Sequence, residues 1–358
     1  MKIFLALFLS FTFCFAEFGQ IAYDNRSEEV LNTFDIEPNF LNNPYFIDVK
    51  NSFFKEGKKD YILNKFEKGY EFIPTLKEMF LKEGIPQEFL YLAMVESEFS
   101  LLAKSNKKAV GMWQFMPKTA QSMGLEINSQ IDERRDPIKS TQAAIAYLKY
   151  LKNTFGKWYL AAIAYNCGDG RLKRAIKEAG SDSLAVLLDP EAKYIPLESR
   201  MYIRKILSVS LLFHNIDLLK SSDYDYFLNR GANSLLATIE AHPSTPLSLI
   251  ASQANLSLKE LKRYNPHFKQ NFTPKKAKIY NVYLPYHLLA SYKEANIKRG
   301  NKITNYLVHK VNKGDTIYSI AKRYGISSKK LTNFNAIKNS NSLSINQEII
   351  IPLDGGNV

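Results

Sequence analysis

The sequence predicts a mainly α-helical domain of the α+β class, followed by two small modules that each run strand, helix, helix, strand. Two observations predict this fold. Apolar residues recur at helical spacing through most of residues 60–213, with short breaks. Beyond them the pattern changes, and residues 238–285 and 306–352 look like one unit used twice, which indicates a duplicated module.

Composition and charge limit the possible classes of protein. The 358 residues are 46% hydrophobic and 23% charged, which excludes a wholly disordered chain and a polytopic membrane protein. The net charge of +13 favours a polyanionic partner or an anionic surface. Two cysteines supply neither a disulfide framework nor a Cys-rich zinc site. We expect no metal and no cofactor.

The N-terminus has the pattern of an export signal. The apolar run Ile3–Phe15 follows Lys2 and is too short to cross a bilayer, but it suits the core of a signal peptide. We therefore expect cleavage after Ala16 and export to the periplasm or cell envelope. A retained anchor is the alternative. Lipidation of Cys14 is not expected, because the preceding Phe13 is not a small residue.

Capping residues and prolines mark the helices of the main domain. Pro86 precedes Gln87–Phe99, a segment that is apolar on more than one face and so predicts a buried helix. Asp136 and Pro137 are an N-cap and a first-turn proline, and helical spacing continues to Phe155. Further helices are expected at 158–165, 171–179 and 199–213.

The repeat defines the C-terminal organisation. Thr245–Asn265 aligns without gaps with Asp315–Asn335, and each copy ends in a β-rich stretch before a proline. We predict a signal peptide (1–16), an N-terminal extension (17–59), a main domain (60–230), a first module (236–286), a linker (287–304) and a second module (305–353).

Glu96 is the candidate catalytic residue. It ends the apolar run Phe89–Val95, so desolvation and the negative end of a helix dipole should both raise its pKa. A carboxyl with a raised pKa is suited to general acid catalysis at neutral pH. An exposed glutamate at a fraying helix end is the alternative, and this feature alone favours that alternative.

Four ordered motifs change that balance. They are 96–99 (ESEF), 109–117 (AVGMWQFMP), 164–168 (AYNCG) and 198–202 (ESRMY), and together with 132–137 (DERRDP) they resemble the lytic transglycosylases, most closely the membrane-bound lytic murein transglycosylase D family. That family has a goose-type lysozyme-like catalytic domain. The stretch 311–321 (VNKGDTIYSIA) resembles LysM, a peptidoglycan- and chitin-binding module. The resemblance covers roughly residues 60–353.

The resemblance implies a set of site residues. Glu96 matches the catalytic acid/base, and the positions matched to substrate contact are Ser97, Ser105, Met112, Trp113, Gln114, Phe115, Tyr165, Asn166, Glu198 and Tyr202. Tyr165 is expected to hydrogen-bond Glu96. The chain departs from the family in three places: Lys108 stands where glycine is frequent, Ser199 replaces threonine, and no lipobox is present.

The charged residues around Glu96 favour a mechanism with a single carboxylate. Ordinary glycosidases use two. Glu98 should project to another helix face, and Asp132, Glu133 and Asp136 are expected in a solvated loop. One acid suffices if the nucleophile is the C6 hydroxyl of the substrate, and the product is then a 1,6-anhydro-muramic acid end.

The expected partners are peptidoglycan glycan strands, with the second module binding a GlcNAc-containing polymer. Its seven Lys and Arg against two acids suit an acidic glycan–peptide polymer. Glycan binding by the first module and peripheral membrane contact are left open, and nucleic acid is not expected. The alternatives are a hydrolytic muramidase or chitinase, with Glu198 as second carboxylate, and a non-catalytic cell-wall-binding protein.

Overall fold

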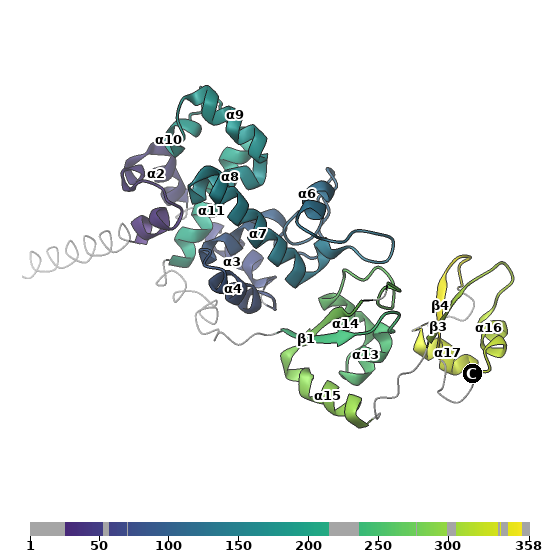
Figure 1. Ribbon diagram of the computed structural model, residues 1–358. Coiled ribbons are helices and arrows are strands. Elements are labelled where there is room, and N and C mark those ends of the chain that lie inside the picture. The colour runs from purple at the N-terminus through teal and green to yellow at the C-terminus, as the bar shows by residue number, and fades with distance from the viewer. Residues whose placement is uncertain are drawn as a thin grey trace, which may run out of the picture. The chain divides into compact units, whose positions relative to one another are not determined.

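The computed structural model describes residues 26–52, 57–69, 71–214, 236–276, 278–298, 306–335, 337 and 343–352 (Figure 1). The predicted signal peptide, residues 1–16, lies outside them. The chain divides into two compact units. The first comprises Met1–Ser100, Met112–Gln114 and Thr141–Asn233, and the second comprises Leu101–Gly111, Phe115–Ser140 and Ser234–Val358.

The first unit is helical, as the sequence predicts. Its elements are η1 (Pro38–Asn42), α2 (Pro44–Asn51), α3 (Lys58–Glu67), α4 (Ile73–Lys82), η3 (Gln87–Phe89), α5 (Leu90–Ser97), α7 (Pro137–Phe155, which begins in the second unit), α8 (Trp158–Cys167), α9 (Asp169–Ala179), α10 (Leu184–Leu187) and α11 (Leu197–His214).

The helices α5 and α8 form the centre of this unit, and both pack against α11. Leu90–Met94 and Tyr159–Ala164 are apolar on all faces and are buried throughout, as expected for helices at the centre of a domain. The ends of the helices follow the predicted signals. Asp136 accepts hydrogen bonds from the first amides of α7, and Gly180 ends α9 with a left-handed φ of 61°.

The second unit contains both βααβ modules. Its elements are α6 (Pro117–Ser122), η4 (Glu133–Arg135), β1 (Leu236–Ala241), α13 (Leu247–Gln253), α14 (Leu258–Tyr264), β2 (Tyr280–Pro285), η6 (Tyr286–Leu288), α15 (Leu289–Lys298), β3 (Tyr306–Lys310), α16 (Ile317–Arg323), α17 (Ser328–Phe334) and β4 (Glu348–Pro352). Strands β1 and β2 pair antiparallel, as do β3 and β4. The predicted order of elements is therefore confirmed in both modules.

An asparagine at the equivalent position of each module explains part of the internal repeat. Asn265 donates to Leu261 O at 2.9 Å and accepts from Tyr283 N at 2.7 Å, which ties α14 to β2. Asn335, which stands at the equivalent position, accepts from Ile350 N at 2.8 Å and ties α17 to β4. Each amide satisfies buried backbone groups that the short helix and strand leave open. No helix in the described parts of the chain is both long and apolar enough to cross a membrane.

Candidate active site

Glu96 lies at the C-terminal end of α5. Glu96 is partly exposed and follows five buried residues of the helix. The helix stops abruptly, because Glu98 and Phe99 both adopt left-handed backbone with φ of 54° and 59°. Such backbone is strained for residues with a side chain and persists only where the surroundings impose it.

The contacts beyond the helix supply that constraint. The Phe99 ring is buried beside Gly69, at which an added Cβ would lie 2.5 Å from Phe99 Cδ2. Glu98 forms ion pairs with Lys65 and Lys68. The expectation that Glu98 serves a different face from Glu96 agrees with these contacts.

The surroundings of Glu96 tune its protonation. Burial raises the pKa of Glu96 to about 7, and the neighbouring Glu198 carboxylate acts in the same direction. The nearby Tyr202 hydroxyl and the charge of Lys205 oppose the rise in pKa. Glu198, Tyr202 and Lys205 stand four and three residues apart on α11, so one face of that helix sets the electrostatics of Glu96. Near neutral pH the carboxyl can therefore both give and take a proton.

Two buried tyrosines accompany Glu96. Burial raises the pKa of both Tyr165 and Tyr202, and the negative charge of Glu96 raises it further. Both phenols are therefore neutral. The Tyr165 hydroxyl donates to Trp113 O at 2.9 Å, where the sequence led us to expect Glu96. The Tyr202 hydroxyl is near Glu96, but it makes no hydrogen bond of good geometry to any described side chain or backbone group.

The Met112–Gln114 segment contributes mainly backbone groups. Met112 and Trp113 are fully buried, and Trp113 Nε1 donates to Thr141 Oγ1 at 2.9 Å. Ser97 Oγ donates to Met112 O at 2.7 Å. Gln114 is partly exposed and has a left-handed φ of 48°. Substrate contact by these side chains stays a prediction, and the buried pair packs in the core.

Asn166 is held at the end of α8. Ser199 Oγ, which is buried on α11, donates to Asn166 Oδ1 at 2.7 Å. Serine in place of threonine at position 199 preserves the hydroxyl that makes the bond.

Comparison with known proteins identifies three domains in this chain. The model of the transglycosylase SLT domain matches residues 76–186, which include Glu96, Gln114 and Tyr165. The chain carries a transglycosylase SLT domain. The LysM-like domain of lytic transglycosylase MltD matches residues 236–298, and the LysM domain matches residues 309–352.

Individual relatives agree with the domain matches. Membrane-bound lytic murein transglycosylase D of Escherichia coli K12 is a homologue, 31% identical over 272 residues, and the match covers 72% of this chain and 58% of that protein. The peptidoglycan transglycosylase of Escherichia phage T7 is 35% identical over 121 residues, 33% of this chain and 9% of that one. The chain thus spans 58% of the first relative's length.

Solved structures of lytic transglycosylases are more distant. The 70-kDa soluble lytic transglycosylase of Escherichia coli is 23% identical, with a TM-score of 0.33 over 44% of this chain and 25% of that chain. The lytic transglycosylase Slt of Pseudomonas aeruginosa is 23% identical, with a TM-score of 0.34 over 40% of this chain and 24% of that chain.

Two predicted residues of the SLT domain, Ser105 and Phe115, lie in the second unit. Ser105 Oγ accepts from Ala109 N at 3.0 Å and closes a turn. The buried Phe115 pairs with Val110 in an isolated β-bridge. Lys108, where the resemblance led us to expect glycine, adopts a left-handed φ of 69°, which is the conformation that glycine permits most readily.

Sequence reasoning was wrong about one segment and missed one residue. Asp132, Glu133 and Asp136, which we expected in a solvated loop, are only 1–3% exposed because charged and polar partners surround them. Lys205 was not identified as a candidate, because its place near Glu96 depends on how α11 packs against α5. In the described parts of the chain no group of three or more His, Cys, Asp or Glu side chains could hold a metal ion.

Proposed function

We propose that the chain is a peptidoglycan lytic transglycosylase that cleaves the MurNAc–GlcNAc β-1,4 bond without water and leaves a 1,6-anhydroMurNAc end. The observation that carries this proposal is Glu96, a single carboxyl at the end of an apolar helix whose pKa burial raises to about 7. A pKa near neutrality suits a group that must first donate and then accept a proton.

In the first step Glu96 protonates the glycosidic oxygen, and the bond to the anomeric carbon breaks as positive charge develops on the MurNAc ring. In the second step the C6 hydroxyl oxygen of the same sugar attacks the anomeric carbon, and the Glu96 carboxylate accepts its proton. The carboxyl thus returns to its starting state. Tyr202 can donate to the carboxylate formed between the steps, because its hydroxyl is close and neutral.

A hydrolase on the same scaffold would need a second, positioned carboxylate to activate water. The two nearest in sequence or space are poor candidates. Glu98 is paired with Lys65 and Lys68, and Glu198 is exposed to solvent in the first turn of α11. A non-catalytic binding protein would gain nothing from a carboxyl whose ionisation burial opposes.

Paired glutamate variants test the proposal on purified sacculi. Glu96→Gln keeps the shape of the side chain but removes the transferable proton, and it should lower the rate by about 10³–10⁴-fold or more. Glu198→Gln should lower the rate by less than about tenfold, since Glu198 raises the pKa of Glu96 but does not supply the transferred proton. Equal, near-complete losses in both variants would favour a two-carboxylate hydrolase. Unchanged release of soluble fragments by Glu96→Gln would remove Glu96 from the mechanism.

We also propose that residues 1–16 direct export to the periplasm and that the LysM domain binds peptidoglycan. The basic composition of the LysM domain and its exposed Tyr318 support the second point, because an aromatic ring can stack on a sugar face. N-terminal sequencing of the mature protein should give Glu17 first. An intact Met1 or an acylated Cys14 would contradict the export proposal as stated.

A further inference from the structure

The LysM-like module at 236–298 shares its core with a segment of the SLT domain. Ile131 is 1% exposed and lies in the same hydrophobic cluster as Leu247 and Phe268. The backbone of residues 130–132 continues the contact. Asp132 N donates to His267 O at 2.9 Å, and Lys269 N donates to Gln130 O at 3.0 Å. The segment 126–136 is therefore built into the module and is not merely placed beside it.

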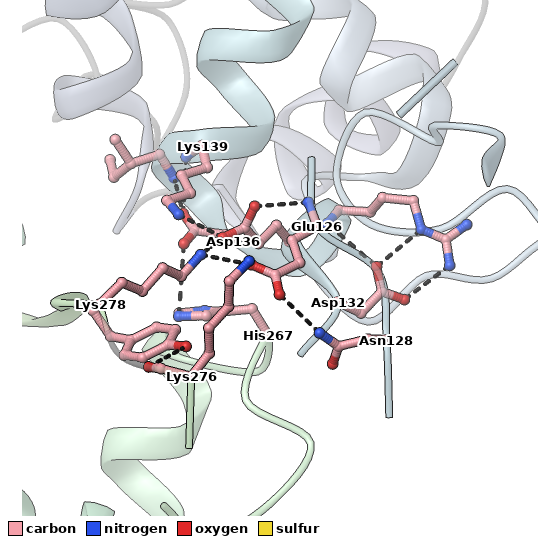
Figure 2. Close-up of polar contacts among 12 residues, drawn as sticks. Glu126, Asn128, Asp132, Asp136, Lys139, His267, Lys276 and Lys278 are labelled. Atoms are coloured by element: carbon pink, nitrogen blue, oxygen red, sulfur yellow. Dashed lines mark hydrogen bonds and ion pairs between the residues drawn. The ribbon is translucent and has the colours of Figure 1, made fainter. Parts of the chain in front are cut away.

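Buried polar contacts fix the same junction. Figure 2 shows Asp136 beside His267, whose Nε2 lies 3.6 Å from Asp136 Oδ2. The Tyr283 hydroxyl donates to Asp136 with oxygen–oxygen distances of 2.9 and 3.1 Å. All three residues are at most 1% exposed. Because Asp136 also caps α7, its position is set from both sides.

Lys278 adds a charged contact at the edge of the junction. Its ammonium lies 2.6 Å from Glu126 Oε2 and 3.8 Å from Glu133 Oε1 (Figure 2). Glu133 is buried and is also paired with Lys139 at 2.5 Å. A buried carboxylate is stable only when such partners surround it, so the module supplies part of what the 126–136 segment needs in order to fold.

The same segment holds the loop that carries predicted substrate residues. Asp132 forms a bidentate pair with Arg134, whose Nη1 donates to Lys108 O at 3.0 Å and Phe115 O at 3.3 Å. Gly111 lies so close that an added Cβ would be 1.8 Å from Arg134 O. Arg134 thus clamps both ends of residues 108–115.

We propose that the LysM-like module at 236–298 is a positioning element of the SLT domain. Tyr283 and Lys278 of the module hold Asp136 and Glu126 of the 126–136 segment, and through Arg134 this segment holds residues 108–115. This inference rests on the proposed function, because it assigns the module a role in binding glycan at the catalytic site.

Two matched pairs of variants in the full-length chain test it. Tyr283→Phe removes only the hydroxyl that binds Asp136, and Tyr292→Phe makes the same change in the same module on α15. Lys278→Gln removes the contact with Glu126, and Lys262→Gln removes a lysine that contacts Gln270 and Asn271 within the module. The substrate is a soluble, uncrosslinked glycan strand.

The variants at the junction should raise KM about three- to tenfold, the size expected for loss of one hydrogen bond, while kcat stays within about twofold. Both controls should keep the KM of the wild type. Hydrogen exchange of residues 104–111 should be faster in Tyr283→Phe and Lys278→Gln only. A purely structural defect would lower kcat through loss of folded enzyme and leave KM unchanged.

KM values equal to those of the controls, or a fall in kcat alone, would overturn the inference. If Tyr283→Phe does not fold, Lys278→Gln at the partly exposed edge gives the answer by itself. The proposed function fails separately. Wild-type products without anhydro ends would refute it even if the KM and exchange changes appear, whereas anhydro products with unchanged KM would refute only the positioning role.

Discussion

Because burial raises the pKa of Glu96 to about 7 from its ordinary 4.5, ionising this carboxyl costs more in the folded chain than in the unfolded chain. The stability associated with the protonated form is fully present below about pH 4.5 and is lost as pH rises through about 7. Glu96→Gln does not titrate. Its free energy of unfolding should therefore exceed that of the wild type by a margin that grows over this range, up to about 3 kcal/mol.

Urea unfolding of both proteins across this pH range measures the margin. A difference that does not vary with pH would mean that the folded chain does not perturb Glu96. The raised pKa of Glu96 would then carry no cost in folding stability.

The pH dependence of the reaction should follow the same group. The first step needs the protonated carboxyl, so kcat/KM on a soluble glycan should fall about tenfold per pH unit above about pH 7. Initial rates from acid to alkaline pH give this profile. A plateau that continues well above pH 7 would assign the acid to another residue.

The sequence predicted the setting of Glu96 better than its partners. The apolar run before Glu96 is a local pattern, so the desolvation could be foreseen from residues 89–95. The positions of Tyr202 and Lys205 depend on how α11 packs against α5, and no local pattern reports that. The donation from the Tyr165 hydroxyl to Trp113 O likewise depends on packing, since Trp113 lies on another segment of the chain.

At the scale of elements, the end of α5 depends on a close approach between Gly69 and Phe99. Gly69→Ala would place a Cβ 2.5 Å from the buried Phe99 ring and should lower the free energy of unfolding by about 1–3 kcal/mol. Gly170→Ala is the control, because the nearest atom to its Cβ is the flexible Arg174 side chain at 4.0 Å. It should be neutral or stabilising by up to about 1 kcal/mol.

Chemical denaturation of the two alanine variants separates these cases. Equal stabilities would show that the chain end after α5 accommodates a side chain at Gly69 without strain. The left-handed residues that follow the helix would then need another explanation.

The elements show where sequence reasoning succeeds and where it does not. Helix ends at Asp136 and Gly180, and the order of elements in both modules, follow from caps, glycines and periodicity, and the structure confirms them. The burial of Asp132 and Asp136 was not foreseen. Local composition predicts that charged residues are exposed to solvent. Asp136 is buried by His267 and Tyr283, which lie more than 130 residues away in the sequence.

At the scale of the whole molecule, the LysM domain and the SLT domain should have separable roles. Removal of residues 305–358 should weaken binding to insoluble sacculi in a pelleting assay, because a tethered binding module raises the local concentration of substrate. It should change the rate on short soluble glycans by less than about twofold. Full retention in the pellet after the deletion would remove the binding role from this domain.

The nucleophile is the central claim, and digestion of purified peptidoglycan in ¹⁸O-labelled water tests it most directly. If the C6 hydroxyl attacks, fragments end in 1,6-anhydroMurNAc, are about 18 mass units lighter than the hydrated sugar and contain no ¹⁸O, because no water enters the bond that breaks. Mass spectrometry of the soluble fragments distinguishes the two outcomes. Reducing ends with ¹⁸O at the anomeric carbon in most fragments would show that water is the nucleophile and that Glu96 does not act alone.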